Sequence, residues 1–414
     1  MVNHYAVPPS EPGGTRHHAL AKGLLTYGWN ATIFASSVNH QSGHNRLSSN
    51  ERSRSDLIDG INFVSIVADN AKHRRREAGR VMGMVRFAYQ VATADVVEYG
   101  EALKADVVIG SSVHPLAALA GWVVARRLGV PFIFEVRDLW PESLVAMGRL
   151  GRRSPAAVLL YGLERFLFNR ATFVISPLPR IAHYARERLG SDSRFRVIHN
   201  GIDVDWFEAM CDRPSPLPSP TSSFTVMYAG AMGTANALPV VLDGYRMFRD
   251  AHPGVSAELR LVGDGPMRKG LEAKVREEGI SGVAFFDSVA KDHVPALLQQ
   301  ADVLVISVAN QPELYRYGIC MNKFFDYLAS GKPTLSASGA DTDPIALSGG
   351  GIRVQPGDAA AISDGLRKLF MSTPEERRDI GLLAKAYVRR HHDFKAIAED
   401  LAHVLNAACK RGVT

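Results

Sequence analysis

Lys323 and Asp326 are the charged side chains whose spacing most clearly predicts a binding site in this sequence. They lie in the segment 322–330, between an apolar run at 302–306 and Gly331, a residue type that commonly ends helices. This pattern predicts a helix that follows a buried parallel strand and is capped by Asn322, with Lys323, Asp326 and Ser330 on its polar face. Ligands of open α/β sheets bind at that edge, where a helix N-terminus and a lysine attract phosphate and an aspartate accepts hydrogen bonds from sugar hydroxyls. The segment is equally compatible with a core helix that has a solvated polar face.

The wider segment resembles a known donor-site motif. From Gly318 to Pro333 the chain reads Gly-Ile-Cys-Met-Asn-Lys-Phe-Phe-Asp-Tyr-Leu-Ala-Ser-Gly-Lys-Pro, which is similar to the motif of glycosyltransferases of the GT-B fold, family four. It is most similar to the bacterial branch that builds surface polysaccharides and transfers amino sugars such as N-acetylfucosamine. The resemblance implies that Asp326 holds the ribose or the sugar of a nucleotide-sugar donor. The commonest residue there is Glu, so Asp326 is one methylene shorter.

A second candidate ligand-binding turn lies near the N-terminus. Residues 1–5 predict the end of a first strand, and Gly13 and Gly14 follow in a turn that lets the backbone approach a ligand before a helix begins. The order Asn-His-Tyr-Ala, two prolines, Gly-Gly-Thr-Arg-His is similar to the opening of the same glycosyltransferase branch. That branch has several apolar residues before its Asn-His-Tyr, whereas only Met1 and Val2 precede it here. We therefore expect that translation starts a few residues upstream or that the first strand is short.

Charged residues also end the predicted strand 132–136, which continues into Arg137 and Asp138. Buried charges are costly unless they are paired, so a charged cluster at a strand end suggests a site. The string Phe-Glu-Val-Arg-Asp-Leu-Trp-Pro-Glu nearly matches the surface-polysaccharide branch. The resemblance implies that Arg137 or Asp138 binds the acceptor or serves as a base. A purely structural ion pair is the alternative.

His114 follows the predicted buried strand 105–110. A histidine at the C-terminal end of a parallel strand is well placed for catalysis, although a lone histidine can equally be structural. The resemblance places an active-site histidine or an equivalent polar group in this loop, which makes His114 a catalytic candidate together with Asp138.

In the second half of the chain, Gly230 ends the predicted strand 224–230, and Gly263 ends a later strand at a phosphate-side turn. Many members of the family carry an Arg and a Lys after the first of these strands, and these residues clamp the donor diphosphate. The matching positions here are Ala231 and Asn236, so two donors of charge-assisted hydrogen bonds are missing. The resemblance then implies that Asn236 contacts the donor through its amide, while a lysine and helix N-termini bind the phosphates.

Strands and helices alternate in both halves of the 414-residue chain, which predicts an α/β protein with two Rossmann-like, doubly wound parallel-sheet domains facing a cleft, the GT-B architecture. We expect an N-terminal domain over 1–210, a Pro/Ser-rich linker over 211–223, a nucleotide-sugar-binding domain over 224–385, and helices over 386–414 that cross back to the first domain. Residues 38–58 are polar and without period, which predicts a loop.

The composition is that of a soluble globular protein, with 46% hydrophobic and 22% charged residues and a net charge of +6. This mild basic excess suits anionic ligands or an anionic membrane surface, and we expect no nucleic-acid partner. The basic run 72–76 and the apolar helical pattern over 81–89 could lie on an anionic bilayer or form a solvated loop before a buried helix. Three widely spaced cysteines and the absence of a long apolar run predict a cytoplasmic location, either free in the cytoplasm or at the inner face of the membrane.

The resemblance implies a retaining, metal-independent glycosyltransferase that needs no cofactor. It would move a sugar, in this branch an N-acetylated amino sugar, from a UDP-sugar to a hydroxyl of a lipid-linked or oligosaccharide acceptor in cell-surface polysaccharide biosynthesis, such as that of lipopolysaccharide. The Asp-x-Asp pairs at 203–205 and 341–343 lie in linker-like or polar context, so neither is expected to hold a metal. Two alternatives remain open: a sugar-nucleotide epimerase of the same fold, and a catalytically silent glycosyltransferase-like partner subunit.

Overall fold

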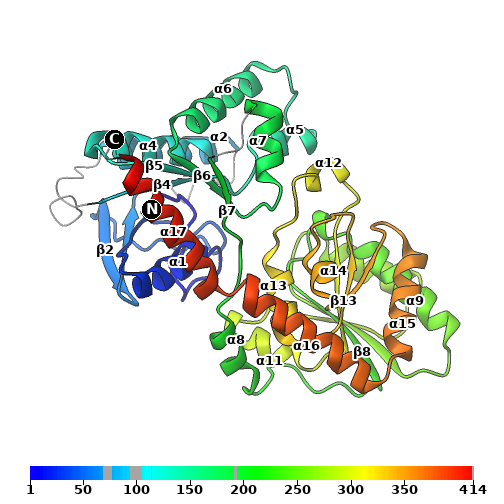
Figure 1. Cartoon of the computed structure of the whole chain (residues 1–414). Coiled ribbons are helices and arrows are strands. Elements are labelled where there is room, and N and C mark those ends of the chain that lie inside the picture. Colours follow the sequence, from blue (N-terminus) through cyan, green and yellow to red (C-terminus); the bar gives the residue numbers. More distant parts are fainter. Residues whose placement is uncertain (69–76, 94–104, 113, 191–193, 413–414) are drawn as a thin grey trace. The chain divides into compact units, whose positions relative to one another are not determined.

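The chain forms two compact α/β units. The computed structural model describes residues 1–68, 77–93, 105–112, 114–190 and 194–412. One unit comprises Met1–Asn200 together with Phe394–Thr414, and the other comprises Gly201–Asp393 (Figure 1). Each unit has a sheet that is parallel, apart from one edge strand of the first unit, with helices on both faces, as the alternating sequence pattern predicts.

The unit boundaries differ from those that composition suggests. The first crossing is at Asn200 rather than at 210, because α8 (Val204–Cys211) packs on the second unit and buries Phe207 in its core. The return crossing is at Phe394 rather than at 386. The two crossings lie side by side, since the Ile202 amide donates to the carbonyl of His392 at 2.8 Å. Backbone pairing, which composition does not report, therefore decides where the units divide.

The sheet of the first unit runs in the order β2-β3-β1 and then β4-β5-β6-β7. Its strands are β1 (Thr32–Ser36), β2 (Ser53–Ile58), β3 (Ile61–Ile66), β4 (Val108–Ser111), β5 (Phe132–Glu135), β6 (Phe173–Ser176) and β7 (Phe195–Val197). The segment 1–5 joins the two groups of strands by bridges from Val2 to Phe34 and Gly110. The expected first strand is thus reduced to a short bridge between β1 and β4.

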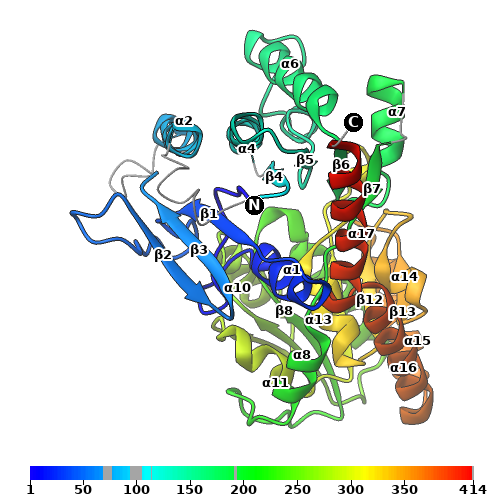
Figure 2. The same cartoon turned by 60° about the vertical axis from the view of Figure 1, so that its left-hand side comes forward.

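Helices cover both faces of this sheet. They are α1 (Arg16–Leu24), the short η1 (Leu25–Tyr27), α2 (Glu77–Thr93), α4 (Pro115–Leu128), α5 (Glu142–Ala146), α6 (Pro155–Arg170), α7 (Ile181–Leu189) and α17 (Phe394–Gly412). α1 and α17 pack against each other, and Ile109 of β4 faces them, whereas the next residue, Gly110, contacts α4. Figure 2 shows α2, α4 and α6 as neighbouring helices.

The prediction that residues 38–58 form a loop is wrong for their last part. Residues 53–58 form β2, which pairs antiparallel with β3 through a turn at Asp59 and Gly60, both at positive φ. An Asp-Gly pair is a strong hairpin signal, because both central residues of the favoured turn need positive φ. β2 has mostly exposed or half-exposed side chains, so its composition reads as polar. The sheet is therefore parallel except at this edge.

The sheet of the second unit is parallel throughout, in the order β10-β9-β8-β11-β12-β13. Its strands are β8 (Phe224–Ala229), β9 (Ala257–Val262), β10 (Val283–Phe286), β11 (Val303–Ser307), β12 (Thr334–Ala337) and β13 (Gly351–Val354). Its helical segments besides α8 are η2 (Thr234–Asn236), α9 (Leu238–Ala251), α10 (Arg268–Glu277), η3 (Lys291–His293), α11 (Val294–Leu298), α12 (Pro312–Tyr315), α13 (Asn322–Ser330), α14 (Pro344–Ser348), α15 (Ala359–Met371) and α16 (Pro374–His391).

Two hydrophobic clusters fill the two faces of this second sheet. Val303 and Val305 of β11 belong to the cluster with α9 and α15, whereas Leu304 and Ile306 belong to the cluster with α13 and α16. Such alternation is what a strand buried on both faces produces, and it explains the continuous apolar run at 302–306. The second cluster fixes α13 in place at the sheet.

α13 itself follows the predicted pattern with two corrections. Phe325 and Leu328 are buried, and Gly331 ends the helix in the left-handed conformation with φ +69°. The N-cap is Met321 rather than Asn322, which is the first helical residue. Ser330 lies on the buried side, where its hydroxyl donates to the Tyr327 carbonyl at 2.6 Å. Lys323 and Asp326 are half-buried, at the N-terminal half of the helix.

Candidate functional site

The candidate residues form two groups, one in each unit. The first unit holds Gly13, Gly14, His114, Arg137 and Asp138, and the second holds Gly230, Asn236, Gly263, Lys323 and Asp326. The basic run at 72–76, for which the sequence suggests contact with an anionic membrane surface, lies outside the described residues.

The Lys323 ammonium reaches the loop that follows β8. Its Nζ donates hydrogen bonds to Asn236 Oδ1 at 2.6 Å and to Tyr228 Oη at 2.7 Å, and it lies 4.4 Å from the centroid of the Tyr228 ring. Tyr228 Oη and Asn236 Nδ2 both donate in turn to the Ala231 carbonyl, at 2.5 Å and 2.9 Å. Lys323 therefore links α13 to this loop, and the structure brings two of the predicted donor-site residues into direct contact.

The charge of Lys323 is not neutralised by an acidic side chain in the part of the chain that the structure describes. An ammonium has three N–H donors, and the two that are used here go to uncharged acceptors. Burial without a counter-charge lowers the pKa of Lys323 to about 7. A bound anion would supply the missing counter-charge and the third hydrogen-bond acceptor, so this group is suited to a phosphate.

Gly230 and Gly263 let the two strand ends approach each other and approach Lys323. A Cβ at Gly230, whose φ is +154°, would lie 3.4 Å from Lys323 Nζ. A Cβ at Gly263, whose φ is +140°, would lie 2.0 Å from the Gly230 carbonyl oxygen, which no side chain tolerates. Gly230 thus faces the lysine directly, whereas Gly263 supports the turn through backbone packing.

Asp326 lies one turn after Lys323 on α13. Among the described residues its carboxylate has no hydrogen bond or ion pair, and no side-chain bond joins it to Lys323. Burial raises its pKa to about 6, and the Lys291 charge opposes this shift. The next residue, Tyr327, anchors the helix to β8, since its hydroxyl accepts from the Ala229 amide at 2.8 Å. Asp326 is therefore a hydrogen-bond acceptor in a fixed position that receives no hydrogen bond from the described residues.

The first unit contains a different kind of charged cluster, centred on Glu135 at the end of β5. Glu135 is buried and accepts from Arg16 Nε at 3.0 Å and from His17 Nε2 at 2.7 Å. Asn3 Nδ2 donates to His17 Nδ1 at 2.9 Å, which fixes the neutral tautomer of His17 with its proton on Nε2. Although burial opposes it, the interactions with His17 and Arg16 hold the pKa of Glu135 well below its usual range. Glu135 thus anchors the start of α1.

Arg137 and Asp138 follow this cluster but do not join it. A Cβ at Gly14 would lie 3.8 Å from Arg137 Nη1, so the guanidinium lies beside the glycine turn. Among the described residues neither side chain forms a hydrogen bond or an ion pair, although the Arg137 charge acts on the pKa of both Glu135 and Asp138. Although the Asp138 side chain is exposed, desolvation by its surroundings raises its pKa, and the Arg137 charge opposes this.

His114 is the buried N-cap of α4. Its Nδ1 accepts from the Ala117 amide at 3.3 Å, so the proton of the neutral ring is on Nε2, which donates to His4 Nδ1 at 2.6 Å. Burial and the neighbouring His4 keep the pKa of His114 well below its usual range. His114 is therefore neutral, with both ring nitrogens engaged inside the protein. This geometry favours a positioning role over proton transfer.

Several residues that the sequence did not single out complete these sites. Tyr228 precedes Gly230 by two positions at the end of β8, and a tyrosine at the carboxyl end of a parallel strand is the signal that could have found it. Arg16 and His17 directly follow the Gly-Gly-Thr turn, at the predicted helix start. His4 is signalled only by its place in the Asn-His-Tyr segment, because its partner is distant in sequence.

One aspartate of each Asp-x-Asp pair accepts hydrogen bonds from residues nearby in the sequence. Asp203 caps α8 by accepting from the Trp206 amide at 3.0 Å. Asp343 is buried and accepts from Ser336 Oγ at 2.6 Å and from the Ile345 amide at 2.8 Å. Within the described residues, no group of three or more His, Cys, Asp or Glu side chains is arranged to hold a metal ion.

Comparison with solved structures identifies the fold as GT-B. Sucrose-phosphate synthase from Thermosynechococcus elongatus matches with a TM-score of 0.71 and 16% identity, covering 98% of this chain and 97% of that one. The trehalose-6-phosphate synthase OtsA matches with a TM-score of 0.73 and 12% identity, covering 98% of both chains. Anabaena HepE, solved in complex with UDP, matches with a TM-score of 0.67 and 14% identity over 97% of this chain and 98% of that one. At these identities the likeness concerns the fold alone.

Two family models and one relative match the chain by sequence. The glycosyl transferase 4-like domain matches residues 13–201, and glycosyl transferases group 1 matches residues 223–372. Both halves of the chain therefore match glycosyltransferase domain models, a 4-like domain in the N-terminal half and a group 1 domain in the C-terminal half. It is 28% identical over 201 residues to the 2-deoxystreptamine glucosyltransferase of Streptomyces kanamyceticus, a match that covers 46% of this chain and 50% of the relative. The chain thus matches this curated relative over about half of the relative's length.

Proposed function

We propose that this glycosyltransferase transfers a sugar from a UDP-sugar, bound by its second unit, to a hydroxyl group of an acceptor. The observation that carries the proposal is the un-neutralised Lys323 beside Gly230, with the unsatisfied Asp326 one helical turn away. A cation and a hydrogen-bond acceptor in this order suit a molecule with a phosphate at one end and hydroxyls at the other. The UDP in the HepE structure supports a uracil nucleotide as the donor class.

Lys323, Asn236 and the N-terminus of α13 would bind the diphosphate of this donor. In the transfer, the bond between the anomeric carbon and the diphosphate oxygen breaks, and the acceptor oxygen becomes attached to that carbon while its proton is lost. Negative charge develops on the departing diphosphate, and preorganised donors in a desolvated site stabilise it most effectively. Asp326 would accept hydrogen bonds from hydroxyls of the ribose or the transferred sugar, which fixes the donor orientation.

The acceptor is proposed to bind the first unit. Within the part of the chain that the structure describes, Arg137 and Asp138 form no side-chain hydrogen bond or ion pair, and Arg137 lies beside the Gly13–Gly14 turn. A guanidinium next to exposed backbone suits a phosphate or a polar sugar, and the neighbouring carboxylate can accept the hydroxyl proton. His114 would support these groups through His4 and α4 rather than react itself.

The finer parts of the proposal come from the resemblance to the surface-polysaccharide branch. They are retention of anomeric configuration, independence of metal, an N-acetylated amino sugar on the donor, and a lipid-linked or oligosaccharide acceptor. A location at the cytoplasmic face of a membrane is supported by α2, which exposes Val81, Met82 and Tyr89 and also carries Arg80 and Arg86. In the described part of the chain no helix is long and apolar enough to cross a membrane.

A thermal-shift panel with UDP, GDP, ADP and their sugars, with and without EDTA, tests the donor assignment. Stabilisation by UDP and UDP-sugars that is insensitive to EDTA is the expected result, and release of UDP in the presence of an acceptor then tests transfer. Because Ala231 and Asn236 stand where many relatives have basic residues, the competing outcome is a silent subunit. Stabilisation without turnover on any acceptor would support that reading, and no shift at millimolar nucleotide would reject the proposed donor site.

A further inference from the structure

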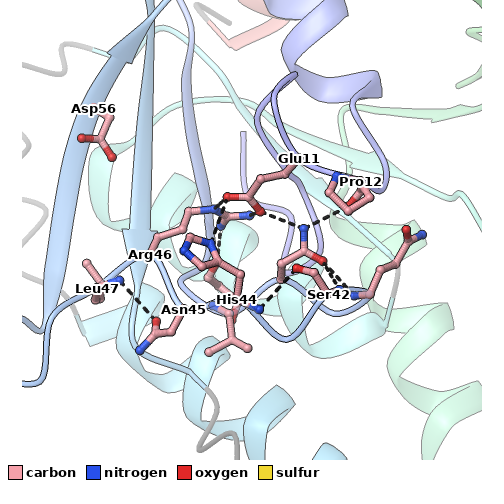
Figure 3. Close-up of polar contacts among 12 residues, drawn as sticks. Glu11, Pro12, Ser42, His44, Asn45, Arg46, Leu47 and Asp56 are labelled. Carbon is pink, nitrogen blue, oxygen red and sulfur yellow. Dashed lines mark hydrogen bonds and ion pairs between the residues drawn. The ribbon is translucent and has the colours of Figure 1, made fainter. Parts of the chain in front are cut away.

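A buried ion pair between Glu11 and Arg46 braces the loop that leads to the Gly13–Gly14 turn. Arg46 Nε donates to Glu11 Oε1 at 2.7 Å, and Nη2 donates to Glu11 Oε2 at 2.8 Å, so the pair is bidentate (Figure 3). The side chain of Arg46 is 5% exposed and that of Glu11 is 16% exposed. Although burial opposes it, the hydrogen bonds from Arg46 and Asn39 keep the pKa of Glu11 below its usual value. The pair is therefore ionised and geometrically defined.

Arg46 is held on the sheet side of this pair. Its Nη1 donates to the Ser36 carbonyl at 2.7 Å, at the end of β1, and its guanidinium lies 5.3 Å from the centroid of the Phe63 ring on β3. The Arg46 amide also donates to the Ser37 carbonyl at 2.9 Å. The guanidinium thus has a fixed position relative to the sheet, and Glu11 takes its position from it.

Asn39 adds a second connection to the same loop. Its Nδ2 donates to Glu11 Oε2 at 2.7 Å and to the Pro12 carbonyl at 2.9 Å, while its Oδ1 accepts from the Gln41 amide at 2.8 Å. The Pro12 carbonyl directly precedes Gly13, whose φ of +138° only glycine adopts readily. The brace therefore ends one peptide bond before the turn.

We propose that Arg46 is a positioning residue for the transfer reaction, acting through Glu11 on the Gly13–Gly14 turn. The inference rests on the proposed function, in which this turn and the adjacent Arg137 receive the acceptor. Prolines at positions 8, 9 and 12 have no N–H, so this loop has few backbone bonds of its own to hold it. Without the Arg46 fork the turn would shift relative to Arg137, and displacement by about 1 Å can cost about a hundredfold in rate.

The test compares Arg46→Met with Arg54→Met. Arg54 provides a matched control, because it pairs with Asp56 at 3.1 Å on the same edge of the sheet but both side chains are exposed. In Arg46→Met we expect kcat per folded molecule to fall about ten- to a hundredfold, while UDP affinity stays within about twofold because UDP is assigned to the other unit. Arg46→Lys keeps the charge but not the bidentate guanidinium, so its kcat should lie between that of Arg46→Met and that of the wild type. Arg54→Met should match the wild type.

Hydrogen–deuterium exchange provides a readout that does not need turnover. Faster exchange in the peptide containing Gly13 and Gly14, with unchanged exchange in the second unit, is expected for Arg46→Met. If that variant fails to fold, Glu11→Gln keeps the size and the Asn39 contact and serves the same measurements. Unchanged kcat per folded molecule, or unchanged exchange at the turn, would overturn the positioning role. If the wild type itself transfers no sugar, the proposed function fails, whereas the exchange result still decides whether Arg46 holds the turn.

Discussion

The charged clusters of the two units differ in how far the protein satisfies them. In the first unit, Glu135 is buried against Arg16 and His17, and these partners hold the pKa of the carboxyl well below its usual range. In the second unit, burial lowers the pKa of Lys323 to about 7 and raises that of Asp326 to about 6, and neither side chain forms an ion pair among the described residues. Each of the latter groups is shifted towards its neutral form, which is the signature of a desolvated charge that lacks a counter-charge.

We propose that this difference separates residues that stabilise the fold from residues that bind a ligand. A buried charge with complete hydrogen bonding contributes rigidity, and its removal is costly for the structure. A desolvated charge without a partner costs stability in the free protein, and such residues cluster at functional sites. The comparison therefore predicts that changes in the first cluster act mainly on folding, whereas changes in the second act mainly on binding and turnover.

Glu135→Ala should have the largest effect, and it should act on stability. The change leaves Arg16 buried without its carboxylate, which typically costs about 3–5 kcal/mol and lowers Tm by roughly 10 °C in a domain of this size. Because the folded-state pKa of Glu135 lies below its unfolded value, its stabilisation is present above about pH 4.5 and is lost as the pH falls through the folded-state pKa. Thermal melting would measure this, with the exposed Asp56→Ala as a control near zero. An equal, small shift in both variants would contradict the assignment.

Lys323→Met should have the largest effect on function with little loss of stability. It removes the cation proposed to stabilise the departing diphosphate, and loss of one such donor typically costs about 10²- to 10³-fold in kcat. The melting temperature without ligand should stay the same or rise, since an un-neutralised buried charge is removed. Kinetics and melting of Lys368→Met, whose side chain is exposed and paired with Asp364, provide the control. If Lys323→Met instead folds poorly but shows normal turnover per folded molecule, Lys323 stabilises the fold and does not act on the donor.

Asp326→Asn should separate binding from stability in the same way. The amide keeps the shape but loses the charge, and hydrogen bonds to a charged group contribute about 1.5–3 kcal/mol, which corresponds to roughly ten- to a hundredfold in affinity for the UDP-sugar. Because burial raises the pKa of Asp326 to about 6, its ionisation costs stability as the pH rises from the unfolded-state pKa through 6. The variant should therefore melt no lower than the wild type at pH 7. Titration calorimetry that finds unchanged UDP-sugar affinity would remove Asp326 from the donor site.

The pH dependence of donor binding should show a smaller, graded effect. A bound diphosphate raises the pKa of Lys323 from its value of about 7, so binding above pH 7 takes up one proton. Affinity should fall by at most about tenfold per pH unit above 7, and calorimetry in buffers of different ionisation enthalpy should detect the proton. Lys323→Arg stays charged at these pH values, so its binding should not change with pH. A wild-type affinity that is equally flat from pH 7 to 9 would mean that Lys323 does not contact the diphosphate.

The fold and the helix of the proposed donor site, α13, could largely be predicted from the sequence because their signals are local. The apolar run at 302–306 and the capped segment 322–330 each report a nearby structural preference, and Lys323 and Asp326 follow from the helical period. The partners of these groups were not accessible. Tyr228 is 95 residues from Lys323 along the chain, so only the register of β8 beside β11 brings them together.

The errors have the same physical origin. The unit boundary at Asn200 depends on the packing of α8, and the edge strand β2 depends on pairing with β3, so polar composition alone misassigned both. The roles of Glu135 and Arg137 could not be told apart from the string Glu-Val-Arg-Asp alone. They differ through the side chains of α1, because Arg16 and His17 bond to Glu135, whereas Arg137 forms no hydrogen bond or ion pair among the described residues.

His114 offers the smallest expected effect and the finest test of the comparison. His114→Ala removes the α4 cap and the donor to His4, which should cost about 1 kcal/mol in the free energy of unfolding, whereas His114→Asn keeps a capping oxygen and should recover most of it. A general acid or base contributes about 10²- to 10⁴-fold to turnover. Turnover per folded molecule should therefore fall by less than about tenfold in both variants if the ring only positions its neighbours. A loss of a hundredfold or more in both variants would show that a neutral histidine with both ring nitrogens hydrogen-bonded still transfers the proton. Complete hydrogen bonding within the protein would then no longer distinguish residues that stabilise the fold from residues that act on the substrate.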